Sequence, residues 1–115
     1  MRRERRLKKS REFAAVRKEG RSWADQVLVL VIRRNGLPVT RFGFAVGRGV
    51  GNAVVRNRVK RRLRSVASDS SVAQGWDLVV IARKRAAESP SITLSESLTD
   101  LLSRAGVMRI QQSKG

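Results

Sequence analysis

Residues 55–66 carry apolar side chains at a spacing of three or four, which is the recurrence of one helix face. At about 100° per residue, Val55, Val59, Leu63 and Val66 fall within a narrow sector that a helix would bury against a core. No acid interrupts the polar positions between them. The pattern therefore predicts an amphipathic helix with an almost wholly cationic outer face. The polar positions are Arg56, Asn57, Arg58, Lys60, Arg61, Arg62, Arg64 and Ser65.

Three further segments have the composition of β-strands. The first is a run of β-branched and leucine side chains that ends near the Asn35-Gly36 turn signal, and this region can contribute two strands. The second follows Pro38 and the third follows Gly75. The cationic helix lies between the second and the third. The strand segments are residues 27–32, 40–46 and 76–82.

Two more amphipathic helices are predicted near the ends of the chain. Ser10 is a suitable N-cap for a helix that runs to about Lys18 and stops at Gly20. Residues 93–96 have the spacing of a capping box, and the leucines that follow them form an apolar face that ends before Gly106. The second of these helices is expected to serve mainly as core.

The order helix, strand, strand, helix, strand, helix predicts the α+β fold class, as a single-domain α/β sandwich. We find no internal repeat and no linker, so residues 1–115 are expected to form one domain. The charged and polar segments 1–9 and 111–115 are expected to be flexible ends.

The charge of the chain points to a polyanionic partner. Lys and Arg number 26 against 9 Asp and Glu, a formal net charge of +17 and a pI near 12. Like charges four residues apart destabilise an isolated helix by a few tenths of a kcal/mol each, so a face with this density of charge makes sense chiefly when a polyanion covers it. At 41% hydrophobic residues the chain is not a disordered basic tail. We therefore expect a folded protein that binds nucleic acid.

The chain lacks the residues that most often carry out acid–base, thiolate and zinc chemistry in proteins. The chain has no Cys and no His, and its acids are scattered singly. No catalytic residue and no metal site in the protein are therefore predicted, although a two-metal nuclease could still collect carboxylates from distant positions. The longest apolar run, residues 27–32, is far shorter than the roughly 20 residues that span a bilayer, so a cytoplasmic protein is expected.

The segment Gly-Asn-Ala-Val-Val-Arg-Asn-Arg-Val-Lys-Arg-Arg-Leu-Arg at 51–64 resembles the protein component of bacterial ribonuclease P. An Arg-Leu-Lys-Lys-Ser-x-x-Phe-x-x-Val opening at 6–16 and an Asp-Leu-Val-Val-Ile-Ala-Arg stretch at 77–83 extend the resemblance to about residues 6–105. It implies a ribosomal-protein-like fold in which the basic helix forms an unusual left-handed βαβ crossover. It also implies a subunit that joins a catalytic RNA to remove the 5′ leader of precursor tRNA.

The resemblance implies particular partners and site residues. Ribonuclease P RNA and precursor tRNA are the expected partners, magnesium acts through the RNA subunit, and no membrane or protein oligomer is required. The RNA-binding residues it indicates are Arg48, Arg56, Asn57, Arg58, Lys60, Arg61 and Arg64. The leader-binding cleft would include Phe13, Arg17 and Val31, of which the last two stand where some members carry aromatic side chains.

Other hypotheses remain open at this point. A structural RNA-binding protein of the ribosome, or of another ribonucleoprotein, would have the same charge and the same basic helix. A DNA-binding regulator is disfavoured, because strands rather than a second helix flank the basic helix. A self-sufficient nuclease is disfavoured by the scattered acids.

Overall fold

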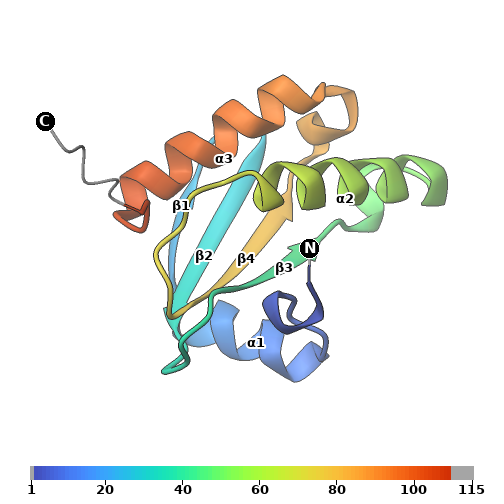
Figure 1. The fold of residues 1–115 in the computed structure, drawn as a ribbon. Helices are drawn as coiled ribbons and strands as arrows, with labels where there is room; N and C mark the ends of the chain where they lie inside the picture. Colours follow the sequence, from blue (N-terminus) through green and yellow to red (C-terminus); the bar gives the residue numbers. More distant parts are fainter. Residues whose placement is uncertain (1, 110–115) are drawn as a thin grey trace, which may run out of the picture.

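The computed structural model describes residues 2–109 as a four-stranded sheet with helices on both faces (Figure 1). In chain order the elements are η1 (Arg3–Arg5), α1 (Ser10–Glu19), β1 (Arg21–Ala24), β2 (Leu28–Arg34), β3 (Arg41–Ala45), η2 (Arg48–Val50), α2 (Ala53–Ser68), β4 (Trp76–Ala82), η3 (Lys84–Glu88) and α3 (Ser91–Ala105). The predicted α+β class is confirmed, and the first strand region does contribute two strands, β1 and β2.

The sheet is mixed, with the strand order β1-β2-β4-β3. β2 pairs antiparallel with β1 and β4, whereas β3 pairs parallel with β4. α2 makes the connection between the two parallel strands. With α2 in front of the sheet in Figure 1 and both strands pointing upward, β4 lies to the left of β3, so the crossover is left-handed. This hand is rare among βαβ units, and it agrees with what the resemblance implies.

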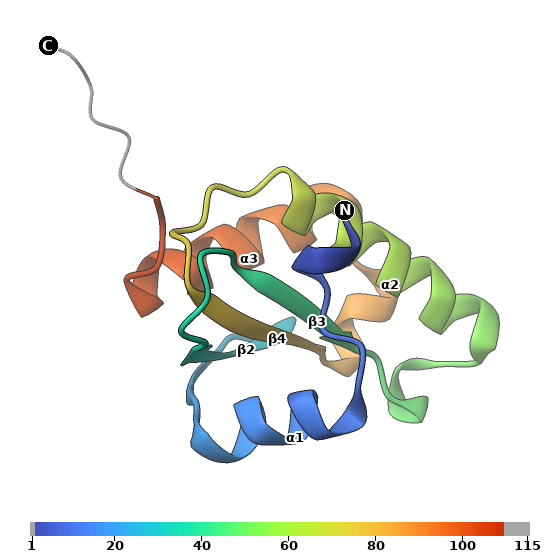
Figure 2. The ribbon, with the colours of Figure 1, turned by 60° about the horizontal axis from the view of Figure 1, so that its bottom comes forward.

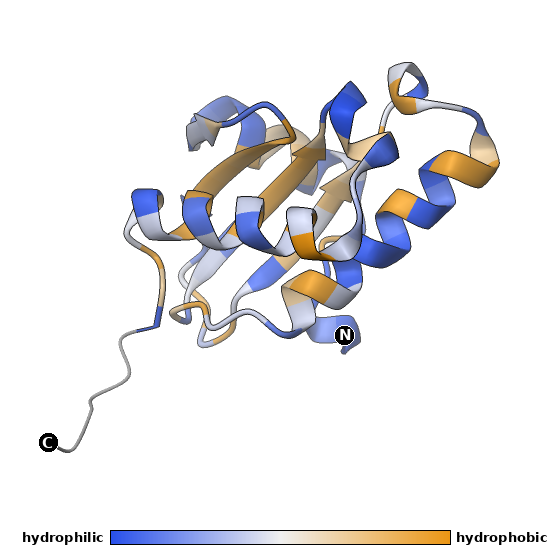
Figure 3. Cartoon of the chain, turned by 90° about the horizontal axis from the view of Figure 1, so that it is seen from above, coloured by the Kyte–Doolittle hydropathy of each residue, from blue (hydrophilic) through white to orange (hydrophobic). Residues whose placement is uncertain are grey.

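Each face of the sheet has its own hydrophobic core, because successive side chains of a strand point to opposite faces. α2 and α3 cover one face, where Leu30, Leu63 and Leu98 are almost completely buried. α1 covers the other face, where Val16 and Val79 are fully buried. Figure 2 shows α1 on the side of the sheet opposite to α2 and α3. In Figure 3 the middle of the sheet has hydrophobic colours, whereas α2 alternates between hydrophobic and strongly hydrophilic segments.

α1 begins at Ser10, so the prediction that Ser10 is the N-cap is wrong by one residue; the N-cap is Lys9. The side chain of Glu12 explains the shift, because its Oε1 accepts the backbone N–H groups of Lys8 (3.1 Å) and Lys9 (2.9 Å). The helix ends at Gly20 as predicted. A Cβ at Gly20 would lie 2.4 Å from the carbonyl oxygen of Val16, so close backbone approach requires glycine there.

α2 begins at Ala53, and Asn52 is its N-cap, since Asn52 Oδ1 accepts the Val55 N–H at 3.0 Å. The predicted capping box at the start of α3 is wrong, because the helix begins at Ser91, directly after Pro90. The Leu94 N–H bonds to the Pro90 carbonyl at 3.2 Å, so the chain is already helical where the box was expected. Gly106 ends the helix, as predicted, and adopts the left-handed conformation.

The N-terminal segment, residues 2–9, lies along the outer edge of β3. Leu7 is buried, and its N–H bonds to the Phe42 carbonyl at 2.8 Å. Arg6 forms a parallel bridge with Phe42. Sequence reasoning had assigned this segment no structural role beyond that of a flexible end. The other expected flexible end, residues 111–115, lies outside the described residues.

Candidate nucleic-acid interface

α2 separates apolar and cationic side chains as its sequence pattern predicts. Val59 and Leu63 are fully buried, and Val55 and Val66 pack at the edge of the same core. This apolar face packs against the core, so the basic side chains of α2 project from the rest of the helix surface. Asn57 and Arg61 are exposed, whereas Arg56, Arg58, Lys60 and Arg64 are half-buried.

The cations of α2 have no carboxylate partners within residues 2–109. The ion pairs of this part of the chain all lie on other elements, at Arg2–Glu4, Arg33–Glu19, Arg41–Glu12, Arg41–Asp77 and Arg104–Asp100. The described side chains include four nitrogens that are shielded from solvent and lack a hydrogen-bond partner. They are the Nε atoms of Arg6, Arg56, Arg58 and Arg64. Three of the four lie on α2, so this helix presents uncompensated positive charge and unused donors.

Two arginines of α2 also hold the helix against its neighbour η3. Arg58 Nη2 donates to the Ala87 carbonyl at 3.3 Å, and Arg62 Nη1 donates to the Ser89 carbonyl at 3.0 Å. Arg58, predicted to bind RNA, therefore has a structural contact as well. Arg48 lies on the exposed surface of η2, just before α2. The predicted RNA-binding residues thus lie on α2 and at its entrance.

A second group of predicted residues lies on α1. Phe13 and Arg17 both line an open depression of about 650 Å³ along this helix, together with Lys8 and Lys18. The ring of Phe13 lies against the edge strand β3, because a Cβ added at Gly43 would come within 2.6 Å of it. The absence of a side chain at Gly43 therefore makes room for the half-buried aromatic ring.

Val31 is not part of this open surface. Its side chain is only 5% exposed and packs beneath α1 with Val16 and Val79, which supports a role in the core. The half-buried apolar residues of the same sheet face are Val29 and Ile81, which are paired across β2 and β4. Sequence reasoning missed both. The alternation along each strand places them on the face of α1, but the region that α1 leaves open depends on how the helix is docked.

A polar network fixes α1 to the sheet. Arg41 on β3 donates from Nε and Nη2 to Asp77 on β4, at 2.8 and 2.7 Å, and from Nη1 to Glu12 on α1 at 3.1 Å. The Asp77 hydrogen bonds raise the pKa of Arg41 above its ordinary value, and Glu12 adds to this effect. The backbone N–H groups of Lys9 and Lys8 lower the pKa of Glu12, so the carboxylate stays charged and holds the helix.

Residues 2–109 contain no group of three or more acidic, His or Cys side chains placed to hold a metal ion. No helix in this part of the chain is long and apolar enough to cross a membrane.

Comparison with known proteins gives one consistent result. A family model described as Ribonuclease P matches residues 1–106. The ribonuclease P protein component of Natranaerobius thermophilus is 46% identical over 84 residues, which cover 71% of this chain and 73% of that protein. The component of Bacillus cereus strain B4264 is 38% identical over 115 residues, covering 97% and 100%. The solved RNase P protein of Staphylococcus aureus superposes with a TM-score of 0.82 at 31% identity, covering 91% and 98%.

Proposed function

The chain belongs to the bacterial ribonuclease P protein family, and from this premise we propose that it binds ribonuclease P RNA and the 5′ leader of precursor tRNA. It is the protein subunit of ribonuclease P. The alternative, a structural protein of the ribosome or of another ribonucleoprotein, is not favoured, since family model and relatives agree on one function.

The observation that carries the proposal is the uncompensated charge of α2. Its arginines and Lys60 form no ion pair within residues 2–109, and Arg56, Arg58 and Arg64 each retain an unpartnered Nε. Guanidinium groups bind phosphate oxygens through paired, charge-assisted hydrogen bonds. An RNA backbone on this face would supply the missing acceptors and release counterions.

The surface of α1 is suited to a single-stranded leader. Phe13 offers an aromatic ring, and stacking of one base on an aromatic side chain is worth about 1–3 kcal/mol without regard to sequence. Arg17 and Lys18 in the same depression can contact the backbone. Val29 and Ile81 extend the apolar surface onto the sheet. We infer that the leader lies along α1 and this part of the sheet, and that its sequence is read only weakly.

Cleavage itself is assigned to the RNA subunit. The acids of the protein are scattered, and those of the Arg41 network are engaged in holding α1. Magnesium ions bound by RNA phosphates would activate the water and stabilise the leaving oxygen. The protein contributes by positioning both RNAs, and we place this work in the cytoplasm, as is typical of bacterial ribonuclease P.

Reconstitution tests the proposal. The protein is mixed with ribonuclease P RNA at low magnesium, and 5′ maturation of a precursor tRNA is measured, with the protein alone and the RNA alone as controls. We expect efficient cleavage only in the mixture. Cleavage by the protein alone would point instead to a nuclease, and failure of the mixture would return weight to a scaffold role.

A further inference from the structure

A pocket of about 400 Å³ lies at the outer edge of β3, between the N-terminal segment and α2. Five cationic side chains line it and no carboxylate does. The N-terminal segment contributes Arg3, Arg6 and Lys8, and α2 contributes Lys60 and Arg64. Residues more than fifty positions apart in the chain thus bring like charges together, which is unfavourable unless an anion lies between them.

Two of these side chains have unused donors. The Nε atoms of Arg6 and Arg64 are shielded from solvent and have no hydrogen-bond partner within the described protein. Buried donors are nearly always paired in folded proteins, so each calls for an acceptor. A phosphate group offers several charged oxygens, and a guanidinium that turns toward it can bind two of them in parallel through Nε and one Nη.

The backbone holds the arginines of the N-terminal segment in place. Arg6 bridges to Phe42, and the next residue, Leu7, is buried beneath α1 and hydrogen-bonded to the same strand. Phe42 and Phe44 stack with ring centroids 6.0 Å apart and form an apolar wall of the pocket. A sugar or base next to the bound phosphate can contact the half-buried Phe44.

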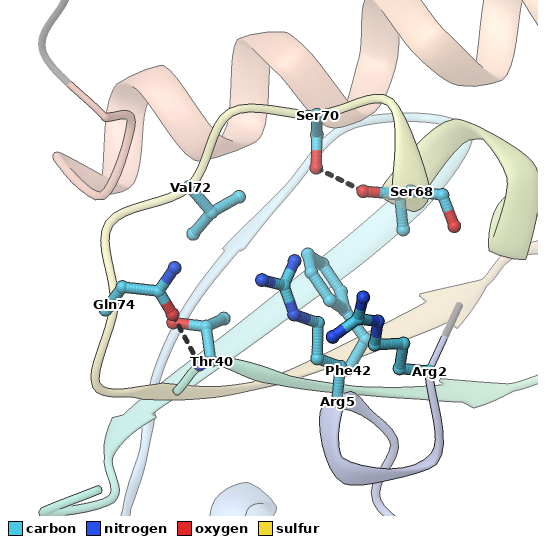
Figure 4. Close-up of a pocket in the computed structure, with 9 residues that line it drawn as sticks. Arg2, Arg5, Thr40, Phe42, Ser68, Ser70, Val72 and Gln74 are labelled. Carbon is cyan, nitrogen blue, oxygen red and sulfur yellow. Dashed lines mark hydrogen bonds between the residues drawn. The ribbon is translucent and has the colours of Figure 1, made fainter. Parts of the chain in front are cut away.

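The segment carries positive charge on its other side too. Arg2 and Arg5 line a neighbouring pocket of about 470 Å³, together with Gln74 from the loop that leads into β4. Figure 4 shows the two guanidinium groups side by side, close to Phe42. Residues 2–9 therefore continue the basic surface of α2 across the edge of the sheet.

We propose that the pocket formed by Arg3, Arg6, Lys8, Lys60 and Arg64 binds a phosphodiester group of RNA, so that the N-terminal segment and α2 grip one strand from two sides. This inference rests on the proposed function and adds the N-terminal segment to the RNA-binding surface. The phosphodiester can belong to ribonuclease P RNA or to precursor tRNA, since both present the same chemistry.

The RNA test uses single charge-removing variants in the full-length protein. Arg6→Gln and Arg64→Gln are compared with Arg104→Gln, which removes the same charge from α3, where Arg104 contacts the opposite sheet edge at Ala24. Two affinities are measured as a function of salt concentration. The first is that of the protein for ribonuclease P RNA, and the second is that of the assembled enzyme for precursor tRNA. We expect each pocket variant to weaken the binding of one of the two RNAs about tenfold and to lower the salt slope of that binding by about one. The arm that changes identifies which RNA is bound.

The double variant Arg6→Gln/Arg64→Gln is expected to lose less than the sum of the single effects, because both side chains hold one phosphate. If Arg6→Gln lowers the folded fraction by circular dichroism, the exposed Arg3→Gln repeats the test. Affinities and slopes equal to those of Arg104→Gln in both RNA arms would overturn the inference, even when the wild-type protein supports tRNA maturation.

A second measurement does not depend on RNA. Inorganic phosphate is titrated into the ¹⁵N-labelled protein, and the arginine Nε–Hε signals are followed by NMR. We expect the signals of Arg6 and Arg64 to shift together with one dissociation constant, and the Arg104 signal to stay in place. Unchanged Arg6 and Arg64 signals, or equal shifts of all three, would overturn the pocket. Failure of reconstitution with these shifts intact would instead count against the proposed function.

Discussion

Replacement of Asp77 by alanine should cost more stability than the loss of any surface acid. The Asp77 side chain is 4% exposed and accepts three hydrogen bonds, from Arg41 Nε at 2.8 Å, Arg41 Nη2 at 2.7 Å and Asn35 Nδ2 at 2.9 Å. Removal of one partner from a buried ion pair typically costs 3–5 kcal/mol. Arg41 remains 23% exposed and keeps Glu12, so we expect the lower end, about 3 kcal/mol.

Urea unfolding followed by tryptophan fluorescence measures this loss as a change in midpoint at constant slope. The control is Asp100→Ala, which breaks the exposed pair with Arg104 on α3 at 3.7 Å and should cost less than about 0.5 kcal/mol. A loss for Asp77→Ala within about 1 kcal/mol of the control would refute this account of the network.

The same variant should loosen α1, because Arg41 joins Glu12 on that helix to the sheet. Hydrogen exchange of the α1 amides should then accelerate more than that of α2. The double variant Asp77→Ala/Arg41→Met should recover part of the stability, since it also removes the guanidinium that has lost its buried carboxylate, while Glu12 keeps its backbone hydrogen bonds from Lys8 and Lys9. No recovery would mean that the hydrogen bonds, rather than the buried charge, set the cost.

Four other perturbations test separate parts of the structure. Gly43→Ala places a Cβ 2.6 Å from the Phe13 ring, so it should weaken binding of leader-bearing precursor tRNA but not of mature tRNA in equilibrium assays. If the variant binds precursor tRNA as tightly as the wild-type protein does, Phe13 is not part of the leader site. Leu63→Ala empties a fully buried position and should cost about 2–5 kcal/mol in urea unfolding, far more than Val54→Ala at an exposed position. Lys60→Ala should lower the salt slope of RNA binding by about one, and an unchanged slope would place Lys60 outside the interface. Because hydrogen bonds lower the pKa of Glu12 below its ordinary 4.5, its stabilising effect is complete above that pH and is lost as the pH falls through the folded value. Glu12→Gln should therefore shrink the stability difference between neutral pH and about pH 3, and an unchanged difference would show that Glu12 contributes nothing.

The sequence alone was sufficient to predict α2, the helix that we propose binds RNA. The side chains of α2 that face the core and those that face solvent follow from the helical period, and the Asn52 side chain caps the helix by accepting the backbone N–H of Val55, three residues away. These are interactions between neighbours in the chain, so their pattern is visible without a fold. The three strand regions were visible for the same reason.

Helix starts were less predictable, because several nearby groups compete for the same backbone donors. At α1 the carboxylate of Glu12 takes the N–H groups of Lys8 and Lys9, and the helix starts one residue earlier than a serine cap would place it. At α3 the chain becomes helical directly after Pro90.

Only the tertiary structure decided which side chains share a surface. Val31 lies in the core while Val29 on the same strand face stays half-open, because α1 covers only part of the sheet. Arg6 and Arg64 share one pocket because the N-terminal segment lies along the edge of β3 beside α2. Local sequence patterns record the preferences of neighbouring residues, whereas docking depends on contacts between segments far apart in the chain. Charge and period therefore predicted an RNA-binding surface on α2, and the packing of distant segments determined which groups surround each cation.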